Sequence, residues 1–93
     1  MYYYILLDPD KPNKCKVGIT KNLEQRLRSY RTANPNCTFY ATYNLPHKIH
    51  EKKILDILKE GFVVRSEYIH CNPQIVNNIV SSYFNELNNR FND

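Results

Sequence analysis

Two strand-like segments near the start of the chain constrain its fold most. Residues 2–7 (YYYILL) are apolar at every position and rich in aromatic side chains, which predicts a buried strand. Residues 15–20 (CKVGIT) alternate between apolar side chains and polar or small ones, as a strand with one buried face does. The loop between them is short, polar and rich in proline. The two strands are therefore expected to pair as an antiparallel hairpin.

The remaining pattern predicts one more strand and three helices. Residues 38–44 (TFYATYN) are typical of a strand, whereas apolar residues recur at helical spacing in residues 23–33, 46–61 and 73–87. Asn22 is a suitable N-cap for the first helix, Pro46 a suitable first-turn residue for the second, and Asn72 a start signal for the third. The order β-β-α-β-α-α predicts an α+β fold, with a small three-stranded antiparallel sheet flanked by helices. We expect residues 1–93 to form a single domain.

Positive charge is concentrated in the first third of the chain. Residues 1–32 hold seven Lys and Arg against three Asp and Glu, whereas residues 33–93 hold six of each. The net charge of +4 therefore comes from this first third, which suits a polyanionic partner such as nucleic acid. A solvated basic face explains the charge pattern equally well. The basic residues expected to contact nucleic acid are Lys14, Lys21, Arg28 and Arg31.

Composition narrows the cellular setting. No apolar stretch approaches the roughly 20 residues that span a bilayer, so we expect no membrane partner. The three cysteines are odd in number and widely spaced, and no leader-like segment comes before the first strand. These features favour a reducing intracellular compartment, cytoplasmic or nuclear, over a disulfide scaffold.

Glu51 is the most informative single residue. On the second predicted helix it shares a face with His47, Ile54, Leu55 and Leu58, so a carboxylate lies in the stripe that should meet the core. Burying an ionised group without a partner is costly. Glu51 is therefore expected either to bind a metal at a cleft or to pair with Lys or Arg at the rim. A hard cation such as Mg²⁺ needs only one such carboxylate, with water completing its shell.

Arg26, Tyr30 and Gly18 also carry a chemical signal. Arg26 lies beside the apolar stripe of the first helix, with Tyr30 one turn away, so the two could clamp a phosphate. Gly18 lies in the second strand, where a glycine weakens pairing unless something approaches closely. We expect a helix or a phosphate to be the group that approaches it.

The stretch KVGITKNLEQRLRSYRTANP, residues 16–35, together with the tyrosines at residues 2–4, resembles the GIY-YIG nuclease superfamily. It is similar to the viral and phage branch, in which KIG or KVG stands in place of YIG. Gly18 matches the family glycine, and Arg26 follows it by eight residues. The resemblance covers about residues 2–70 and implies a GIY-YIG-like fold, a phosphodiesterase activity and a setting such as a virus-infected cell.

The resemblance also implies roles for individual residues. Tyr4 matches the tyrosine that ends the GIY triplet and helps to deprotonate the attacking water. Arg26 matches the arginine that holds the scissile phosphate, and Tyr30 stands where other members carry a second Tyr or His. Glu51 matches the glutamate that binds a single divalent ion, Mg²⁺ or Mn²⁺. Lys16 falls at the first tyrosine of YIG.

Three positions depart from the family pattern. Tyr2 replaces the glycine of GIY, and Lys16 replaces a tyrosine. The family's late asparagine has three candidates, Asn72, Asn77 and Asn78. Tyrosine has an ordinary pKa near 10, so as a base Tyr4 would need a cation nearby. Lys16 or the metal is expected to supply that charge.

Three functions therefore compete. The residues and the resemblance together favour a metal-dependent endonuclease acting on nucleic acid, with DNA favoured over RNA. The alternative is a catalytically weak or inactive nucleic-acid-binding module of the same fold, which Lys16 favours. A third is an interaction protein that docks through a strand or the last helix. A chain this short has no separate specificity domain, so a homodimer or a partner protein could supply target choice.

Overall fold

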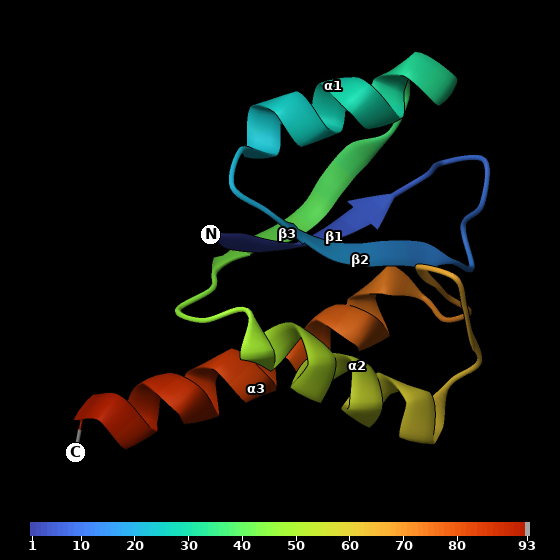
Figure 1. Cartoon of the computed structure of the whole chain (residues 1–93). Coiled ribbons are helices and arrows are strands. Elements are labelled where there is room, and N and C mark those ends of the chain that lie inside the picture. The colour runs from blue at the N-terminus through green and yellow to red at the C-terminus, as the bar shows by residue number, and fades with distance from the viewer. Residues whose placement is uncertain (93) are drawn as a thin grey trace.

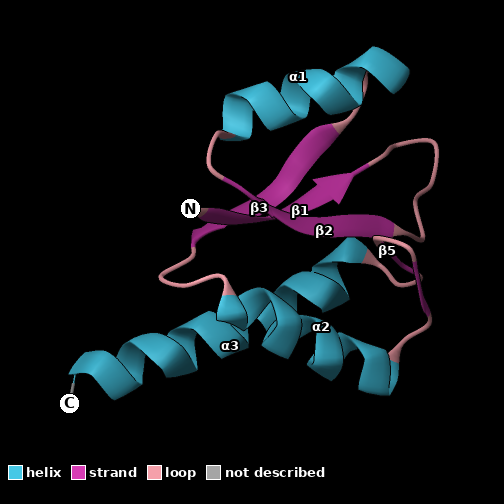
Figure 2. Cartoon of the chain, viewed as in Figure 1, coloured by secondary structure: helices cyan, strands magenta, loops and turns pink. Residues whose placement is uncertain are grey.

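The protein is built as three layers, with a twisted sheet between one helix and a pair of helices (Figure 1). The computed structural model describes residues 1–92, with side chains through residue 89. Helix α1 (Leu23–Ala33) covers one face of the sheet, and helices α2 (Ile49–Gly61) and α3 (Pro73–Asn92) cover the other (Figure 2). None of the helices within residues 1–92 has the length and apolar character needed to cross a membrane.

The sheet is antiparallel throughout and has the order β3-β1-β2-β5-β4. Strands β1 (Tyr2–Leu7), β2 (Cys15–Thr20) and β3 (Thr38–Asn44) have the predicted bounds, and the predicted α+β class is confirmed. The sheet has five strands where the sequence predicted three. The extra strands, β4 (Val64–Arg65) and β5 (Tyr68–Ile69), have two residues each, too few for an alternating pattern to be visible.

Side-chain caps fix the start of α1 and α3. The side-chain oxygen of Asn22 accepts the backbone N–H of Gln25 (3.0 Å), as predicted for the N-cap of α1. The side-chain oxygen of Asn72 likewise accepts the N–H of Gln74 (2.8 Å). Helix α2 begins at Ile49, three residues later than the proline signal suggested. His47 therefore lies outside α2, where its Nδ1 accepts the N–H of Ile49 (3.2 Å).

Alternation along β1 creates two apolar cores. Tyr3 and Ile5 face α2 and α3, in a cluster that includes Ile54 and Val80. Tyr4 and Leu6 point to the other face, where Leu23, Leu27 and Tyr30 of α1 cover them, together with Cys37 and Phe39. Because β1 is central and buried on both faces, its consecutive tyrosines are aimed into opposite layers of the protein.

Candidate active site

A pocket of about 250 Å³ lies at the open end of β2, where all three layers meet. In the described chain, β5 pairs with β2 through Cys15 and Lys16 alone, so the half of β2 that contains Gly18 has an uncovered edge. Tyr3 and Tyr4 contribute from β1, Arg26 from α1, and Glu51 from α2. The full lining is Tyr3, Tyr4, Val17, Gly18, Ile19, Arg26, Glu51, Leu55, Ser66 and Glu67.

Tyr4 explains the glycine in β2. Tyr4 and Gly18 are direct partners across the β1–β2 pair. A Cβ atom placed on Gly18 would lie 2.5 Å from the hydroxyl and 2.8 Å from Cζ of Tyr4. The group that approaches Gly18 is therefore the ring of Tyr4, where the sequence suggested a helix or a phosphate. Tyr4 is buried against Phe39 and Tyr30, so its ring has little room to move away.

We expect Gly18→Ala to destabilise the protein by about 1–3 kcal/mol, the usual cost of overpacking a dense site. The added methyl group displaces Tyr4 and breaks its 2.7 Å hydrogen bond with the Tyr30 hydroxyl. The measurement is urea unfolding of both proteins. Gly61→Ala is the matched control, because nothing lies within 4 Å of its Cβ position at the end of α2, and a helical alanine should stabilise slightly. Equal stability of the two variants would contradict this explanation.

Glu51 is a half-buried carboxylate in the first turn of α2. Burial, reinforced by the nearby Glu67 carboxylate, raises the pKa of Glu51 above its usual range. No hydrogen bond or ion pair reaches its side chain from any side chain of residues 1–89, so the rim ion pair that the sequence left open is not formed. An unpaired, partly desolvated carboxylate beside a second one is a suitable place for a cation.

Arg26 approaches the same pocket from the opposite layer. Its side chain is exposed on α1 and, within the described residues, forms no ion pair. The guanidinium favours the ionised form of Tyr4 and so lowers that pKa, but burial and the hydrogen bond to Tyr30 dominate and raise it well above its usual value. Arg26 is thus free to bind an anion, and Tyr4 holds its proton at neutral pH.

Lys16 and Tyr30 do not line the pocket with Arg26 and Glu51. Both line a neighbouring pocket, and the Lys16 ammonium lies 5.0 Å from the Tyr30 ring centroid and 3.6 Å from a Glu67 carboxylate oxygen. Among the side chains, the cation that lowers the pKa of Tyr4 is Arg26, where the sequence suggested Lys16. Tyr30 lines a different pocket from Arg26, and its hydroxyl is hydrogen-bonded to Tyr4.

Tyr3 lines the pocket, and the sequence did not single it out as a functional residue. Its ring is 1 % exposed, and its hydroxyl is the one buried side-chain polar atom in the described residues that lacks a hydrogen-bond partner. Burial, and secondarily the Glu51 charge, raise the pKa of Tyr3, so the phenol is neutral. The phenol is therefore a neutral donor without a partner, buried beside the pocket. Within YYYILL nothing distinguished it from Tyr2 and Tyr4.

We expect Tyr3→Phe to stabilise the free protein by about 1 kcal/mol, because a buried hydroxyl without a partner costs about 1–3 kcal/mol. For a domain of this size that is a rise of roughly 4–8 °C in Tm. The measurement is thermal unfolding without metal or nucleic acid. Tyr2→Phe, which changes an exposed tyrosine of the same strand, should leave Tm unchanged. A lower Tm for Tyr3→Phe would show that the hydroxyl already has a partner.

Glu67 was also missed, because the segment around it carries no periodic pattern. It occupies the two-residue turn between β4 and β5, beside Ser66, whose φ of 56° is rare for a residue other than glycine. The backbone oxygen of Glu67 accepts the N–H of Val17 (3.3 Å), which anchors the turn against β2. The turn thus brings a second carboxylate to the pocket of Glu51.

The remaining predicted site residues lie outside this pocket. Lys14, Lys21 and Arg28 line none of the pockets described, whereas the Arg31 guanidinium donates to the backbone oxygen of Cys37 (2.9 Å), a structural role. None of the candidate asparagines completes the site: Asn72 caps α3, Asn77 accepts the hydroxyl of Tyr43, and Asn78 lines a groove between α2 and α3. Cys15, Cys37 and Cys71 are free.

The sequence model of the T5orf172 domain matches residues 1–84, most of the chain. The chain belongs to the T5orf172 domain family. T5orf172 domains are phage-associated and occur in nuclease-related proteins, so membership links this chain to nuclease-like or DNA-binding roles. No curated protein and no solved structure matches this T5orf172 domain. The pocket containing Arg26 and Glu51 lies entirely within the matched residues.

The donor set of this T5orf172 domain limits the kind of metal site it could form. No cluster of three or more His, Cys, Asp or Glu side chains occurs in the described part of the chain. A structural zinc site, which needs four such ligands, has no basis in those residues. Glu51 with water molecules suits Mg²⁺ or Mn²⁺, since Mg²⁺ is usually bound by one or two carboxylates and keeps several waters.

Proposed function

We propose that this T5orf172 domain is a GIY-YIG-type endonuclease, which hydrolyses phosphodiester bonds in DNA with the help of one divalent cation. One observation carries the proposal. Arg26 and Glu51 belong to helices on opposite faces of the sheet, yet both line a single pocket beside Tyr4. A guanidinium and a carboxylate without ion-pair partners, facing one small pocket, suit a phosphate together with its cation.

Glu51 would hold the cation, Mg²⁺ or Mn²⁺. Its carboxylate is half-buried and lacks an ion-pair partner among the described residues. Burial and the nearby Glu67 raise the pKa of Glu51, which means that its negative charge is disfavoured there. A bound cation would stabilise that charge. When bound, a divalent ion supplies Lewis-acid stabilisation of the charge that develops on the phosphate oxygens. The neutral hydroxyl of Tyr3, which lacks a partner beside this pocket, would donate a hydrogen bond into the same space.

The other residues of the pocket would bind and orient the phosphate. Arg26 would hold its non-bridging oxygens through a preorganised charge. Tyr4 keeps its proton at neutral pH, so we assign it to hydrogen bonding and to positioning through Tyr30, in place of the base that the family resemblance implied. Glu67, an exposed carboxylate on the same pocket, is then the group we assign to accept the proton of the attacking water.

The test is a nicking assay on supercoiled plasmid. We expect the wild-type protein to convert it to open-circular or linear DNA with Mg²⁺ or Mn²⁺, and to leave it intact with EDTA. Parallel assays on linear duplex, single-stranded DNA and RNA identify the substrate. DNA binding that falls steeply with salt, without cleavage under any metal condition, would contradict the nuclease and support the binding module of the same fold.

A further inference from the structure

A second pocket, of about 340 Å³, lies next to the candidate active site along β2. It is lined by Lys11 and by Asp8 and Asp10 of the β1–β2 loop, by Lys16 of β2, and by Tyr30 and Tyr68 from the flanking elements. Lys16 lies at the boundary, because its ammonium contacts Glu67 of the first pocket and the Tyr30 ring of the second. A strand of nucleic acid that leaves the first pocket along β2 must therefore pass Lys16.

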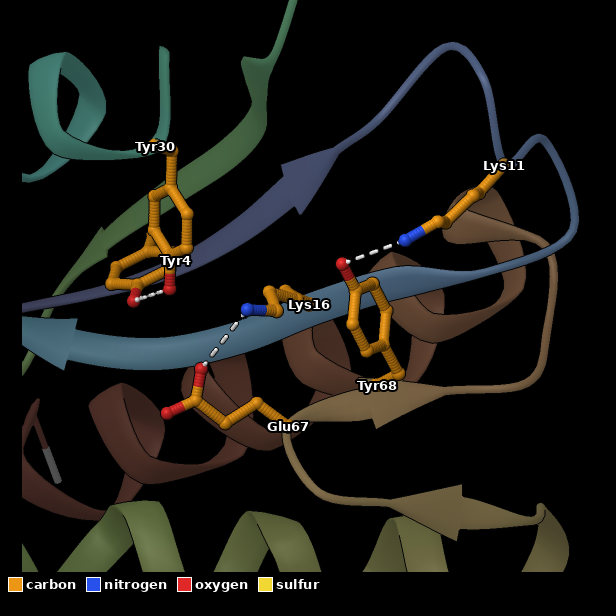
Figure 3. Close-up of polar contacts among 6 residues, drawn as sticks. All are labelled: Tyr4, Lys11, Lys16, Tyr30, Glu67 and Tyr68. Carbon is orange, nitrogen blue, oxygen red and sulfur yellow. Dashed lines mark hydrogen bonds and ion pairs between the residues drawn. The ribbon is translucent and has the colours of Figure 1, made fainter. Parts of the chain in front are cut away.

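The two lysines of this pocket are held by aromatic rings. The Lys16 ammonium lies 4.9 Å from the Tyr68 ring centroid, and the Lys11 ammonium lies 4.7 Å from that same centroid (Figure 3). Lys11 also donates a hydrogen bond to the Tyr68 hydroxyl (3.2 Å). Tyr68 thus holds the ammonium groups of both lysines close to its ring centroid, which restrains two otherwise flexible side chains.

Among the described side chains, the two lysines form a single ion pair, between Lys16 and Glu67. The ion pair of Lys16 with Glu67 is long, at 3.6 Å, and the Glu67 side chain is 62 % exposed, so an anionic ligand can replace it. Asp8 and Asp10 do not pair with the lysines. Their carboxylates accept the side-chain amide of Asn34 at 2.8 Å each. The hydrogen bond to Tyr68, and secondarily the Asp8 charge, raise the pKa of Lys11, so its ammonium stays charged. An anion at the lysines can therefore form the ion pairs that the two aspartates do not form.

We propose that Lys11, Lys16 and Tyr68 form a subsite for a backbone phosphate of the nucleic acid, adjacent to the phosphate in the Arg26–Glu51 pocket. This inference rests on the proposed function, since it takes the first pocket to hold the scissile phosphate. Lys11 and Lys16 bind the phosphate by charge, and Tyr68 is a positioning residue that keeps both ammonium groups aimed at it. The subsite fixes the direction of the strand, which runs along β2 toward the β1–β2 loop.

The test measures DNA affinity against salt concentration, without cleavage. Fluorescence anisotropy with a labelled duplex is recorded in EDTA at several KCl concentrations, with every variant made in a Glu51→Gln background. The slope of log K against log salt is negative, and each lost phosphate contact reduces its magnitude by about 0.9. We expect the double variant Lys11→Gln/Lys16→Gln to reduce the magnitude of the slope by about that amount and to weaken the affinity severalfold. We expect Tyr68→Ala to weaken binding while Tyr68→Phe, which keeps the ring, stays closer to the parent.

Lys52→Gln/Lys59→Gln is the matched control, because it also removes two positive charges, both from exposed positions of α2 that line neither pocket. Its slope should equal that of the parent. An unchanged slope in Lys11→Gln/Lys16→Gln, or an equal loss in Lys52→Gln/Lys59→Gln, would overturn the subsite. These slopes are independent of catalysis, so a wild-type protein that binds DNA with the expected slopes but never cuts it would refute the nuclease and leave the subsite intact.

Discussion

Glu51→Gln is expected to abolish Mg²⁺-dependent cleavage, lowering the single-turnover rate at least about 100-fold, the scale for loss of a preorganised electrostatic group. The amide has nearly the shape of the carboxylate but no charge, so it cannot attract the divalent ion. Because Glu51 forms no hydrogen bond or ion pair within the described side chains, its replacement breaks no structural contact there. The measurement is plasmid nicking at saturating Mg²⁺.

Two controls separate the loss of the ion from other causes. Glu60→Gln removes an exposed carboxylate from the same helix and should cut at the wild-type rate. Glu51→Gln itself should bind DNA in EDTA at least as tightly as the wild type, because it removes a negative charge from the pocket. Cleavage by Glu51→Gln within a few-fold of wild type would remove Glu51 from the mechanism.

Arg26→Ala is expected to lower cleavage by about 10²–10³-fold, because it removes the guanidinium that stabilises the charge growing on the phosphate. We expect the cleavage rate at saturating DNA to fall more than the DNA affinity, because the other basic residues still bind the nucleic acid. Arg26 is exposed and unpaired among the described residues, so the fold should survive with little change in Tm. The measurement is single-turnover cleavage over a range of protein concentrations.

Arg28→Ala is the natural comparison, because Arg28 is exposed on the same helix and lies outside the pocket. It should weaken DNA binding modestly and uniformly, with nearly unchanged rate at saturation. Arg26→Lys should recover only part of the lost rate, since an ammonium cannot form the two parallel hydrogen bonds of a guanidinium. If Arg26→Ala and Arg28→Ala behaved alike, Arg26 would be an ordinary backbone contact.

The main elements could be predicted from the sequence because their patterns are long. The six residues of β1 are apolar at every position, and this central strand is buried on both faces. Asn22 and Asn72 carry local hydrogen-bonding signals that do not depend on the rest of the fold. The predicted start of α2 was wrong because a proline is permitted in the first turn of a helix but does not by itself start a helix.

The site could be predicted only in part, because its geometry depends on tertiary contacts. Periodicity singled out Glu51 and Arg26, which do line one pocket. It could not show that Gly18 accommodates the ring of Tyr4, since that contact is a matter of register between two strands. Glu67 and Tyr68 lie in and beside a two-residue turn, where only pairing with β2 determines their direction. Lys16 pairs with Tyr68 of β5 and lines the neighbouring pocket, whereas the family resemblance placed it in the site with Tyr4.

The most direct measurement locates the divalent ion. Amide NMR spectra of the Arg26→Ala protein, which should retain the ion without cutting, are recorded with a short DNA duplex during titration with Mn²⁺. We expect signals of Gly18, Glu51 and Ser66 to broaden first, at Mn²⁺ concentrations below the protein concentration. The Glu51→Gln/Arg26→Ala protein should show no such selective broadening. Selective broadening elsewhere in the chain, or none that depends on Glu51, would contradict the claim that this pocket binds a catalytic cation.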